Sequence, residues 1–138
     1  MYQYKAQLIK VVDGDTVVVD FDLGFGVWLR DQSVRLSGID APESRTVNKE
    51  EKIRGLLSKK KLSELLYDSD YVLVSTEIDP SEKYGRILGC LETDKGIKVN
   101  QWMIDNFYAV SYAGENKDRI KDAHCANAKK LSDKGELP

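Results

Sequence analysis

Cysteine, histidine and long apolar runs are all scarce in this sequence of 138 residues. The two cysteines, Cys90 and Cys125, come without a secretion signal, so we expect free thiols rather than a disulfide. The one histidine, His124, argues against a histidine-rich metal site, so any bound metal is expected to use oxygen ligands. No apolar run approaches the ~20 residues needed to cross a bilayer, so we expect no association with a membrane.

An excess of charge of one sign is also lacking. The 21 Lys and Arg residues and the 23 Asp and Glu residues leave a net charge of −2, which does not indicate nucleic-acid binding. The distribution is more informative, because a basic stretch interrupts an otherwise acidic chain. Its basic residues are Lys49, Lys52, Arg54, Lys59, Lys60 and Lys61. On its own, such a stretch is most simply the solvated face of a helix.

Length and composition predict a single globular domain over residues 1–138. Hydrophobic residues make up 41% of the chain and charged residues 32%, which is an ordinary mixture for one core of this size. There is no linker, internal repeat or low-complexity segment, and nothing suggests a dedicated interface, so we expect a monomer. The N-terminus lacks the basic and then apolar layout of a signal peptide, which predicts a cytoplasmic protein, or a secreted one only if a leader has been removed.

The first half of the chain is strand-like, and two turn signals divide it. Asp13-Gly14-Asp15 separates the first two strands, and Gly24-Phe25-Gly26 precedes the third. We expect Asp40-Ala41-Pro42 to end the third strand, because proline disfavours pairing in a sheet. The predicted strands are 6–12, 16–23, a third from about Trp28 or Ser33 to Ile39, 71–76 and 86–92.

Three helices are predicted: residues 49–67, a short amphipathic helix with Val99, Trp102, Met103 and Phe107 on one face, and a C-terminal helix. The first has a break in phase, because Leu62 and Leu66 share a face with Ser58 whereas Ile53 and Leu56 point nearly the opposite way. Either its start differs from this range or its first turns pack against something else. In the C-terminal helix His124 recurs with apolar residues at helical spacing, which indicates a histidine at the edge of the core rather than a ligand.

The order β-β-β-α-β-β-α-α predicts an α+β domain. A helix between the third and fourth of five strands is how an OB-fold is assembled. We therefore expect a five-stranded OB-fold β-barrel with three α-helices.

Four polar segments stand out: Asp13-Gly14-Asp15-Thr16, residues 34–43 (VRLSGIDAPE), Lys83-Tyr84-Gly85-Arg86 and residues 106–112 (NFYAVSY). Each alone has an ordinary interpretation as a turn or a strand exit. Together the first three resemble the D-G-D-T, R-L-x-G-I-D-x-P-E and K-Y-G-R motifs of the staphylococcal nuclease (thermonuclease) family, in the same order. The resemblance covers about residues 6–131 and implies the fold of that family.

The resemblance implies a calcium-dependent nuclease with one Ca²⁺ in its active site. Asp15, Asp40 and the backbone carbonyl of Ala41 would be the metal ligands, and Glu43 would position or deprotonate the attacking water. Hard carboxylate oxygens suit calcium, and a carboxylate is an effective base for water. The type member has threonine at the position of Ala41, so this chain loses a hydroxyl but keeps the carbonyl. Asp13 is similar to a carboxylate that supports these ligands without touching the metal.

The same resemblance assigns the substrate contacts. Arg35 and Arg86 would clamp the phosphate, because guanidinium matches phosphate in shape and stays protonated. Lys83, Tyr84 and Tyr112 would hold the terminal phosphate and the nucleoside. The family cleaves DNA or RNA, prefers unpaired strands and leaves 3′-phosphate and 5′-hydroxyl ends. Two departures are a glycine on or near position 114, where the family has a second tyrosine, and a longer segment over residues 24–31, whose effect on substrate access is open.

Three functions from different classes stay open. An active nuclease is favoured because all five principal catalytic positions match. A non-catalytic nucleic-acid-binding or scaffold module is supported by the acidic net charge, which predicts weak association. A barrel that binds protein or oligosaccharide leaves the clustered arginines and carboxylates without a reason. For a nuclease, part of the basic stretch is expected at the mouth of the groove, although a plain helix surface explains Lys59–Lys61 equally well.

Overall fold

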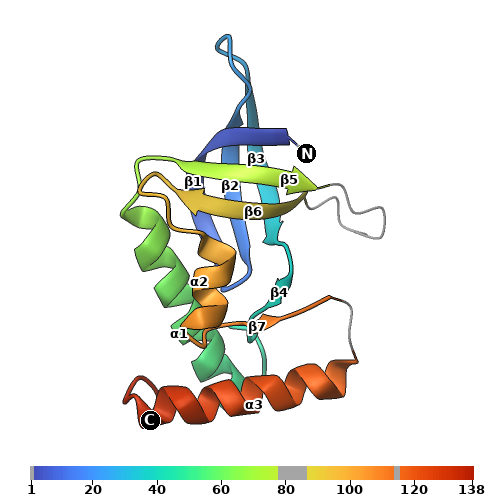
Figure 1. Ribbon diagram of the computed structural model, residues 1–138, viewed down its shortest axis with the longest axis vertical. Coiled ribbons are helices and arrows are strands. Elements are labelled where there is room, and N and C mark those ends of the chain that lie inside the picture. The colour runs from blue at the N-terminus through green and yellow to red at the C-terminus, as the bar shows by residue number, and fades with distance from the viewer. Residues whose placement is uncertain (1, 78–86, 114–115) are drawn as a thin grey trace.

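The computed structural model describes residues 2–77, 87–113 and 116–138 (Figure 1). Five strands close a barrel in the order β1-β2-β3-β6-β5, and β5 returns to pair with β1. Neighbouring strands are antiparallel except for β3 and β6, which are parallel. The strands are β1 (Tyr2–Asp13), β2 (Thr16–Asp22), β3 (Trp28–Leu36), β5 (Val72–Glu77) and β6 (Ile87–Thr93). The predicted OB-type barrel in an α+β domain is therefore confirmed.

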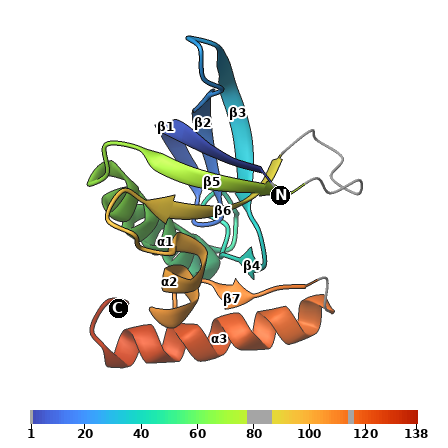
Figure 2. The ribbon, with the colours of Figure 1, turned by 45° about the horizontal axis from the view of Figure 1, so that its top comes forward.

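The described residues form the three helices that the sequence predicts. They are α1 (Lys49–Tyr67), α2 (Val99–Asp105) and α3 (Lys117–Asp133). In both views α3 runs across one end of the molecule, below α2 and the short strand β7 (Val110–Ser111) (Figures 1 and 2). The prediction placed Phe107 within the second helix, and this is wrong: α2 ends at Asp105 and Phe107 has a left-handed φ of 68°. None of the helices in the described part of the chain is both long and apolar enough to span a membrane.

The third strand ends earlier than predicted. β3 stops at Leu36, the chain turns at Gly38 with a φ of 77°, and a separate strand β4 (Ile39–Asp40) pairs with β7 (Val110–Ser111). Asn100 spans the break, because its amide donates to the carbonyl oxygen of Ser37 at 2.8 Å. The break turns the chain out of the barrel just before Asp40.

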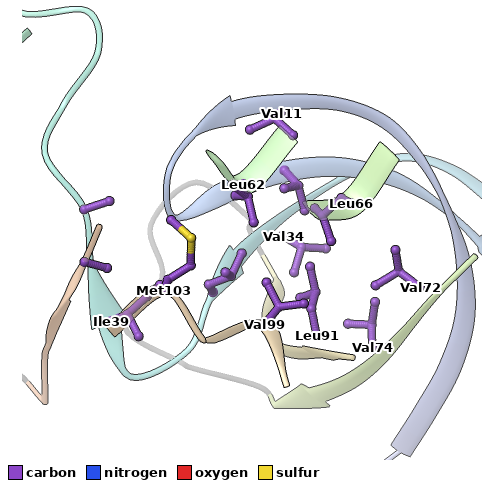
Figure 3. Packing of buried hydrophobic residues seen from close by; sticks show 14 of the residues in the cluster. Val11, Val34, Ile39, Leu62, Leu66, Val72, Val74, Leu91, Val99 and Met103 are labelled. Carbon is purple, nitrogen blue, oxygen red and sulfur yellow. The ribbon is translucent and has the colours of Figure 1, made fainter. Parts of the chain in front are cut away.

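Alternating side chains of the strands fill the barrel, and side chains of α1 and α2 join the same cluster (Figure 3). Val34 and Val74 are fully buried inside it, and Leu62 and Leu66 of α1 pack into the same cluster. α2 adds Met103 to this cluster. One continuous core thus joins the barrel to α1 and α2.

The break in phase on α1 has a structural cause. Asn48 caps the helix by accepting a hydrogen bond from the Glu51 amide, so the predicted start is correct. Its buried face begins with Gly55 and Ser58 before the leucines take over, whereas Ile53 and Leu56 are exposed. The first turns therefore pack against something other than the apolar core, and small residues make that approach possible.

The long hairpin between β2 and β3 projects from the end of the barrel that lies away from α3 (Figures 1 and 2). Its turn exposes Leu23, Phe25 and Val27. Arg30 and Asp20 pair across it with an N–O distance of 2.9 Å. Both cysteines are free and exposed, as expected.

Candidate active site

The Asp-Gly-Asp turn between β1 and β2 is pressed against α1. A Cβ atom on Gly14 would lie 2.7 Å from Cβ of Ser58 and 2.9 Å from Cβ of Ala41. Glycine is therefore required at position 14, because any side chain would collide with Ser58 and Ala41. The close packing brings Asp15, the next residue, under the segment that follows β4.

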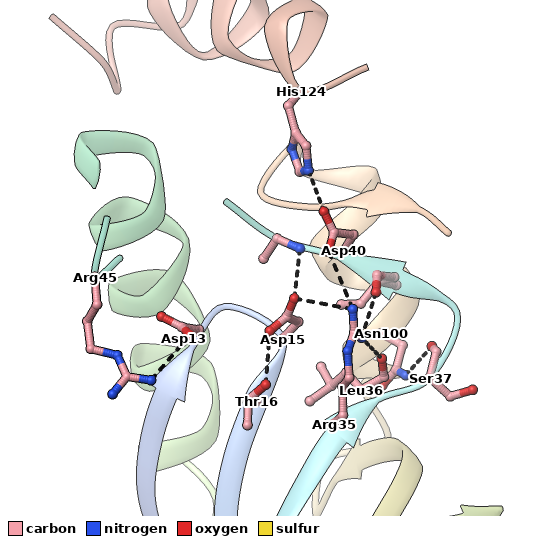
Figure 4. A network of polar contacts seen from close by, with 12 residues as sticks. Asp13, Asp15, Thr16, Arg35, Leu36, Ser37, Asp40, Arg45, Asn100 and His124 are labelled. Carbon is pink, nitrogen blue, oxygen red and sulfur yellow. Dashed lines mark hydrogen bonds and ion pairs between the residues drawn. The ribbon is translucent and has the colours of Figure 1, made fainter. Parts of the chain in front are cut away.

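Asp15 is a buried carboxylate with few charged neighbours (Figure 4). Its Oδ2 accepts a hydrogen bond from the amide of Ala41 at 3.0 Å, and its Oδ1 accepts one from the Thr16 hydroxyl at 3.0 Å. Burial raises the pKa of Asp15, and the nearby Arg35 guanidinium opposes that rise. A cation beside this carboxylate would relieve the cost of burying its charge.

Arg35 lies between the two predicted metal-binding carboxylates. Its Nη1 donates to the carbonyl oxygens of Leu36 at 3.2 Å and Ile39 at 3.0 Å. Its Nη2 lies 3.4 Å from Oδ1 of Asp40 and 3.7 Å from Oδ2 of Asp15. The break between β3 and β4 supplies both carbonyls, so the chain's path holds the guanidinium in place.

Asp40 makes a second contact that the sequence did not reveal. Its Oδ2 lies 2.8 Å from Nε2 of His124 on α3, and the histidine side chain is only 11% exposed. His124 is thus half-buried and hydrogen-bonded, as expected of a histidine at the edge of the core, and its ring also reaches the candidate site. Helical spacing identified the face of α3 but not what that face meets.

Glu43 follows two residues after Ala41, and its backbone rests on α1. A Cβ atom on Gly55 would lie 2.2 Å from the Glu43 carbonyl oxygen, so only glycine allows this approach. Asp13 accepts hydrogen bonds from the backbone amide of Ser44 at 3.3 Å and from the Ser44 hydroxyl. Asp13 therefore holds the chain at the residue after Glu43, and the supporting role predicted for it stays a prediction.

A cavity of about 460 Å³ lies between the barrel, α1 and α3, and Asp15 and Asp13 are not among the residues that line it. Predicted site residues on its wall are Arg35, Asp40, Ala41, Glu43 and Tyr112. The Tyr112 ring centre lies 5.9 Å from the Arg35 guanidinium carbon. Further lining residues are Asn48, Glu51, Arg54, Ile120, Lys121 and His124. The predicted residues Lys83, Tyr84 and Arg86, together with position 114, lie outside the described residues.

The basic stretch divides between two surfaces. Arg54 lines the cavity, and its buried Nε has no hydrogen-bond acceptor in the described part of the chain. Lys61 lies on another face, where its Nζ is 3.5 Å from Glu136 and 3.8 Å from Glu64. The charge of Lys61 is thus compensated within the protein, whereas the charge of Arg54 faces the cavity.

The donor set suits a hard cation. Within residues 2–77, 87–113 and 116–138, no three His, Cys, Asp or Glu side chains gather as a complete metal site. The predicted ligand set needs only two such side chains, Asp15 and Asp40, together with the carbonyl oxygen of residue 41. These two carboxylates share the single cation of Arg35, and oxygen donors of this kind fit calcium.

Comparisons with known proteins find a family and relatives for this chain. A family model described as staphylococcal nuclease homologue matches residues 33–135. Endonuclease YhcR of Bacillus subtilis (strain 168) is 30% identical over 115 residues, which are 80% of this chain and 9% of that protein. Thermonuclease of Staphylococcus intermedius is 29% identical over 116 residues, which are 81% of this chain and 56% of that protein. The chain thus spans about half of one relative and a small part of the other.

Proposed function

The chain belongs to the staphylococcal nuclease homologue family, and from that premise we propose that it is a calcium-dependent nuclease. It hydrolyses phosphodiester bonds of DNA or RNA, with a preference for single strands, and leaves 3′-phosphate and 5′-hydroxyl ends. One observation carries the proposal. Nη2 of Arg35 lies 3.4 Å from Asp40 and 3.7 Å from Asp15, and Glu43 lines the same cavity as Arg35 and Asp40.

The reaction must overcome the repulsion between a nucleophile and an anionic phosphodiester. Asp15, Asp40 and the carbonyl of Ala41 would hold the calcium ion. When bound, this ion supplies positive charge to the phosphate oxygens and lowers the cost of hydroxide attack. The burial of Asp15 supports this role, because a buried carboxylate gains more from a cation than an exposed one does.

Arg35 binds the phosphate and stabilises charge that grows on it during attack. Carbonyls of Leu36 and Ile39 hold Nη1, so little reorganisation is needed when the substrate arrives. Nη2 faces the carboxylates of Asp15 and Asp40, which would hold the ion. The Tyr112 ring beside Arg35 supplies a face for a nucleoside.

Glu43 acts as the base. It is exposed on the cavity wall, and its side chain makes no hydrogen bond or ion pair within the described residues, so it is available to a water molecule. The carboxylate takes a proton from water, the resulting hydroxide attacks phosphorus, and the bond to the 5′ oxygen breaks. The departing oxygen takes up a proton and becomes the 5′-hydroxyl.

A nucleic acid extends beyond one phosphate, and Arg54 offers a further contact. Its guanidinium lines the cavity beside Lys121 of α3. The Arg54 guanidinium would give a phosphate oxygen in the cavity a charged hydrogen-bond donor. We propose that Arg54 binds the backbone of the substrate strand.

The test is cleavage of a single-stranded DNA oligonucleotide with calcium, with EDTA, and by Arg35→Ala and Glu43→Ala variants. EDTA should abolish cleavage, and each substitution should lower the rate by roughly 10²-fold or more. Arg30→Ala is the matched control, because Arg30 lies on the hairpin and its loss should leave cleavage unchanged.

Undiminished cleavage by both site variants would refute the assigned roles. Binding of the oligonucleotide without cleavage under any divalent metal would favour the second candidate, a non-catalytic binding module. The net charge of −2 is the observation that favours this candidate.

A further inference from the structure

The single histidine of the chain is in contact with a predicted metal ligand. Nε2 of His124 lies 2.8 Å from Oδ2 of Asp40, although the two residues are 84 positions apart. We propose that His124 is a positioning residue for the metal site: it holds the outer oxygen of Asp40 and so directs the other oxygen toward the metal. The proposal rests on the proposed function, since it assigns Asp40 to a calcium ion.

The contacts of Asp40 show how this works. Oδ2 is occupied by His124, whereas Oδ1 faces Arg35 at 3.4 Å on the side of Asp15. A carboxylate bonded at one oxygen cannot rotate freely, so Oδ1 stays aimed at the point that both aspartates share. Backbone pairing of Asp40 with Val110 holds the residue from the other side.

The bond is sheltered from water. The His124 side chain is 11% exposed and that of Asp40 is 30% exposed, so solvent competes little for the histidine's donor. The bond needs only a hydrogen on Nε2 that is donated to the carboxylate. Partners of this kind, which orient metal-binding carboxylates, commonly affect metal affinity about 10–100-fold.

Direct metal binding by His124 explains the structure less well. Nε2, the nitrogen that faces the site, is already bonded to Asp40. Asp15, Asp40 and His124 also do not form a cluster of three metal-binding side chains in the described chain. The histidine therefore acts through Asp40.

A purely structural role of His124 in docking α3 can be tested separately from its effect on Asp40, because other residues also hold α3 in place. The Asn127 side-chain amide donates to the carbonyl oxygen of Ala109 at 3.1 Å, and Leu131 is buried in the core. Loss of His124 should therefore leave α3 docked. Asn127 provides a control on the same helix, one turn away, which does not contact Asp40.

The experiment is calorimetric titration of the full chain with calcium, without substrate, for the wild type, His124→Ala, His124→Gln and Asn127→Ala. We expect His124→Ala to weaken calcium binding about 10–100-fold. Glutamine carries an N–H donor at a similar reach, so His124→Gln should recover most of the affinity. Asn127→Ala should lower the melting temperature but leave the calcium dissociation constant within about twofold, as a contact remote from the ligands should.

The outcomes separate the two proposals. Equal calcium affinity of the wild type and His124→Ala would overturn the role of His124 and leave the calcium site in place. Equal weakening by His124→Ala and Asn127→Ala would also overturn it, because a general loosening of α3 would then explain both. Absence of calcium binding by the wild type itself would overturn the calcium assignment and the inference together.

Discussion

Apolar side chains are usually buried and polar ones exposed, and the two ends of the barrel depart from this rule in opposite ways. At the hairpin end, Leu23, Phe25 and Val27 expose apolar side chains to solvent. At the cavity end, Asp15 and Ser58 are polar and buried. Buried polar groups are stable only when they are hydrogen-bonded, and both of these residues have partners. The cavity end therefore depends on contacts between segments far apart in the chain, whereas the contacts of the hairpin join residues close in sequence, such as Arg30 and Asp20.

Glycines show the same contrast. Gly24 and Gly26 of the hairpin have φ values of 84° and 76°, and a Cβ on either would meet nothing within 4 Å. Gly14 and Gly55 at the cavity end have little free space. The hairpin thus requires glycine for its local backbone conformation, and the cavity requires it for contact between distant segments. A substitution at the first kind of glycine should act locally, and one at the second kind should reach the active site.

The largest expected effect comes from Gly55→Ala. The new methyl group would collide with the Glu43 carbonyl oxygen, which lies 2.2 Å from its position, and push Glu43 away from the cavity. We expect cleavage to fall about 10²-fold and the free energy of unfolding to fall by about 1–3 kcal/mol. Rates on the DNA oligonucleotide and urea denaturation measure the two quantities.

Gly26→Ala is its control at the other end. Alanine at position 26 would have to adopt a left-handed φ, which should lower the free energy of unfolding by about 1–2 kcal/mol. Cleavage should be unchanged. If Gly26→Ala lowered the rate as much as Gly55→Ala, the two ends would not differ in the way the structure indicates.

A smaller effect is expected from Arg54→Gln, which removes one of the cations that line the cavity. Affinity for single-stranded DNA, measured with EDTA to prevent cleavage, should weaken about tenfold, which corresponds to about 1.4 kcal/mol. The slope of log affinity against log salt should decrease in magnitude by about 1, as expected for the loss of one phosphate contact. Lys60→Gln makes the same charge change on an exposed position of α1 and should change affinity less. Equal effects of both variants would show that net charge, rather than the position of Arg54, determines binding.

The smallest effect on stability is expected from Glu136→Gln, which removes a contact of the C-terminal segment. Oε1 of Glu136 accepts a hydrogen bond from the Tyr108 hydroxyl at 2.5 Å, and this bond lowers the pKa of Glu136. Glu136→Gln should reduce the free energy of unfolding by about 1 kcal/mol at neutral pH.

The pH dependence has a definite sign. Because the folded-state pKa is lowered, the stabilisation is present above the ordinary pKa of 4.5 and is lost as pH falls through the lower folded-state value. Urea denaturation at pH 7 and in the acid range should therefore show the wild type and variant converging at low pH. Glu64→Gln, which also removes a carboxylate near Lys61, should cost less, because the Glu64 side chain is 54% exposed. A difference that stayed constant over pH would contradict the assigned charge effect.

Much of the fold was predictable because it follows from local patterns. β-Branched runs and turn signals predicted all five barrel strands, and α1 was predicted with its observed bounds. The first two motifs also led to residues that meet in space: Asp15, Arg35 and Asp40 lie in contact. Their catalytic roles stay predictions, as does the role of the third motif, whose residues lie outside the described chain.

Other features were not predictable, because they depend on which distant segments meet. The break after Leu36 needs β7 as a partner, and no local pattern announces a pair of two-residue strands. The phase break on α1 was visible, but its cause was not, because Gly55 and Ser58 face the backbone of Glu43 and the carbonyl of Tyr108. The direction of the hairpin, away from α3, is likewise a property of the closed barrel (Figure 1).

By itself the sequence determined the three helices and the five barrel strands, the class of barrel and the family motifs, since these depend on periodicity and on neighbours along the chain. Only the tertiary structure decided that Arg54 faces the cavity while Lys61 pairs elsewhere, and that His124 reaches Asp40. Helical periodicity identifies which residues share a face. What that face touches is set by how the helices dock on the barrel, through contacts between residues far apart in the chain.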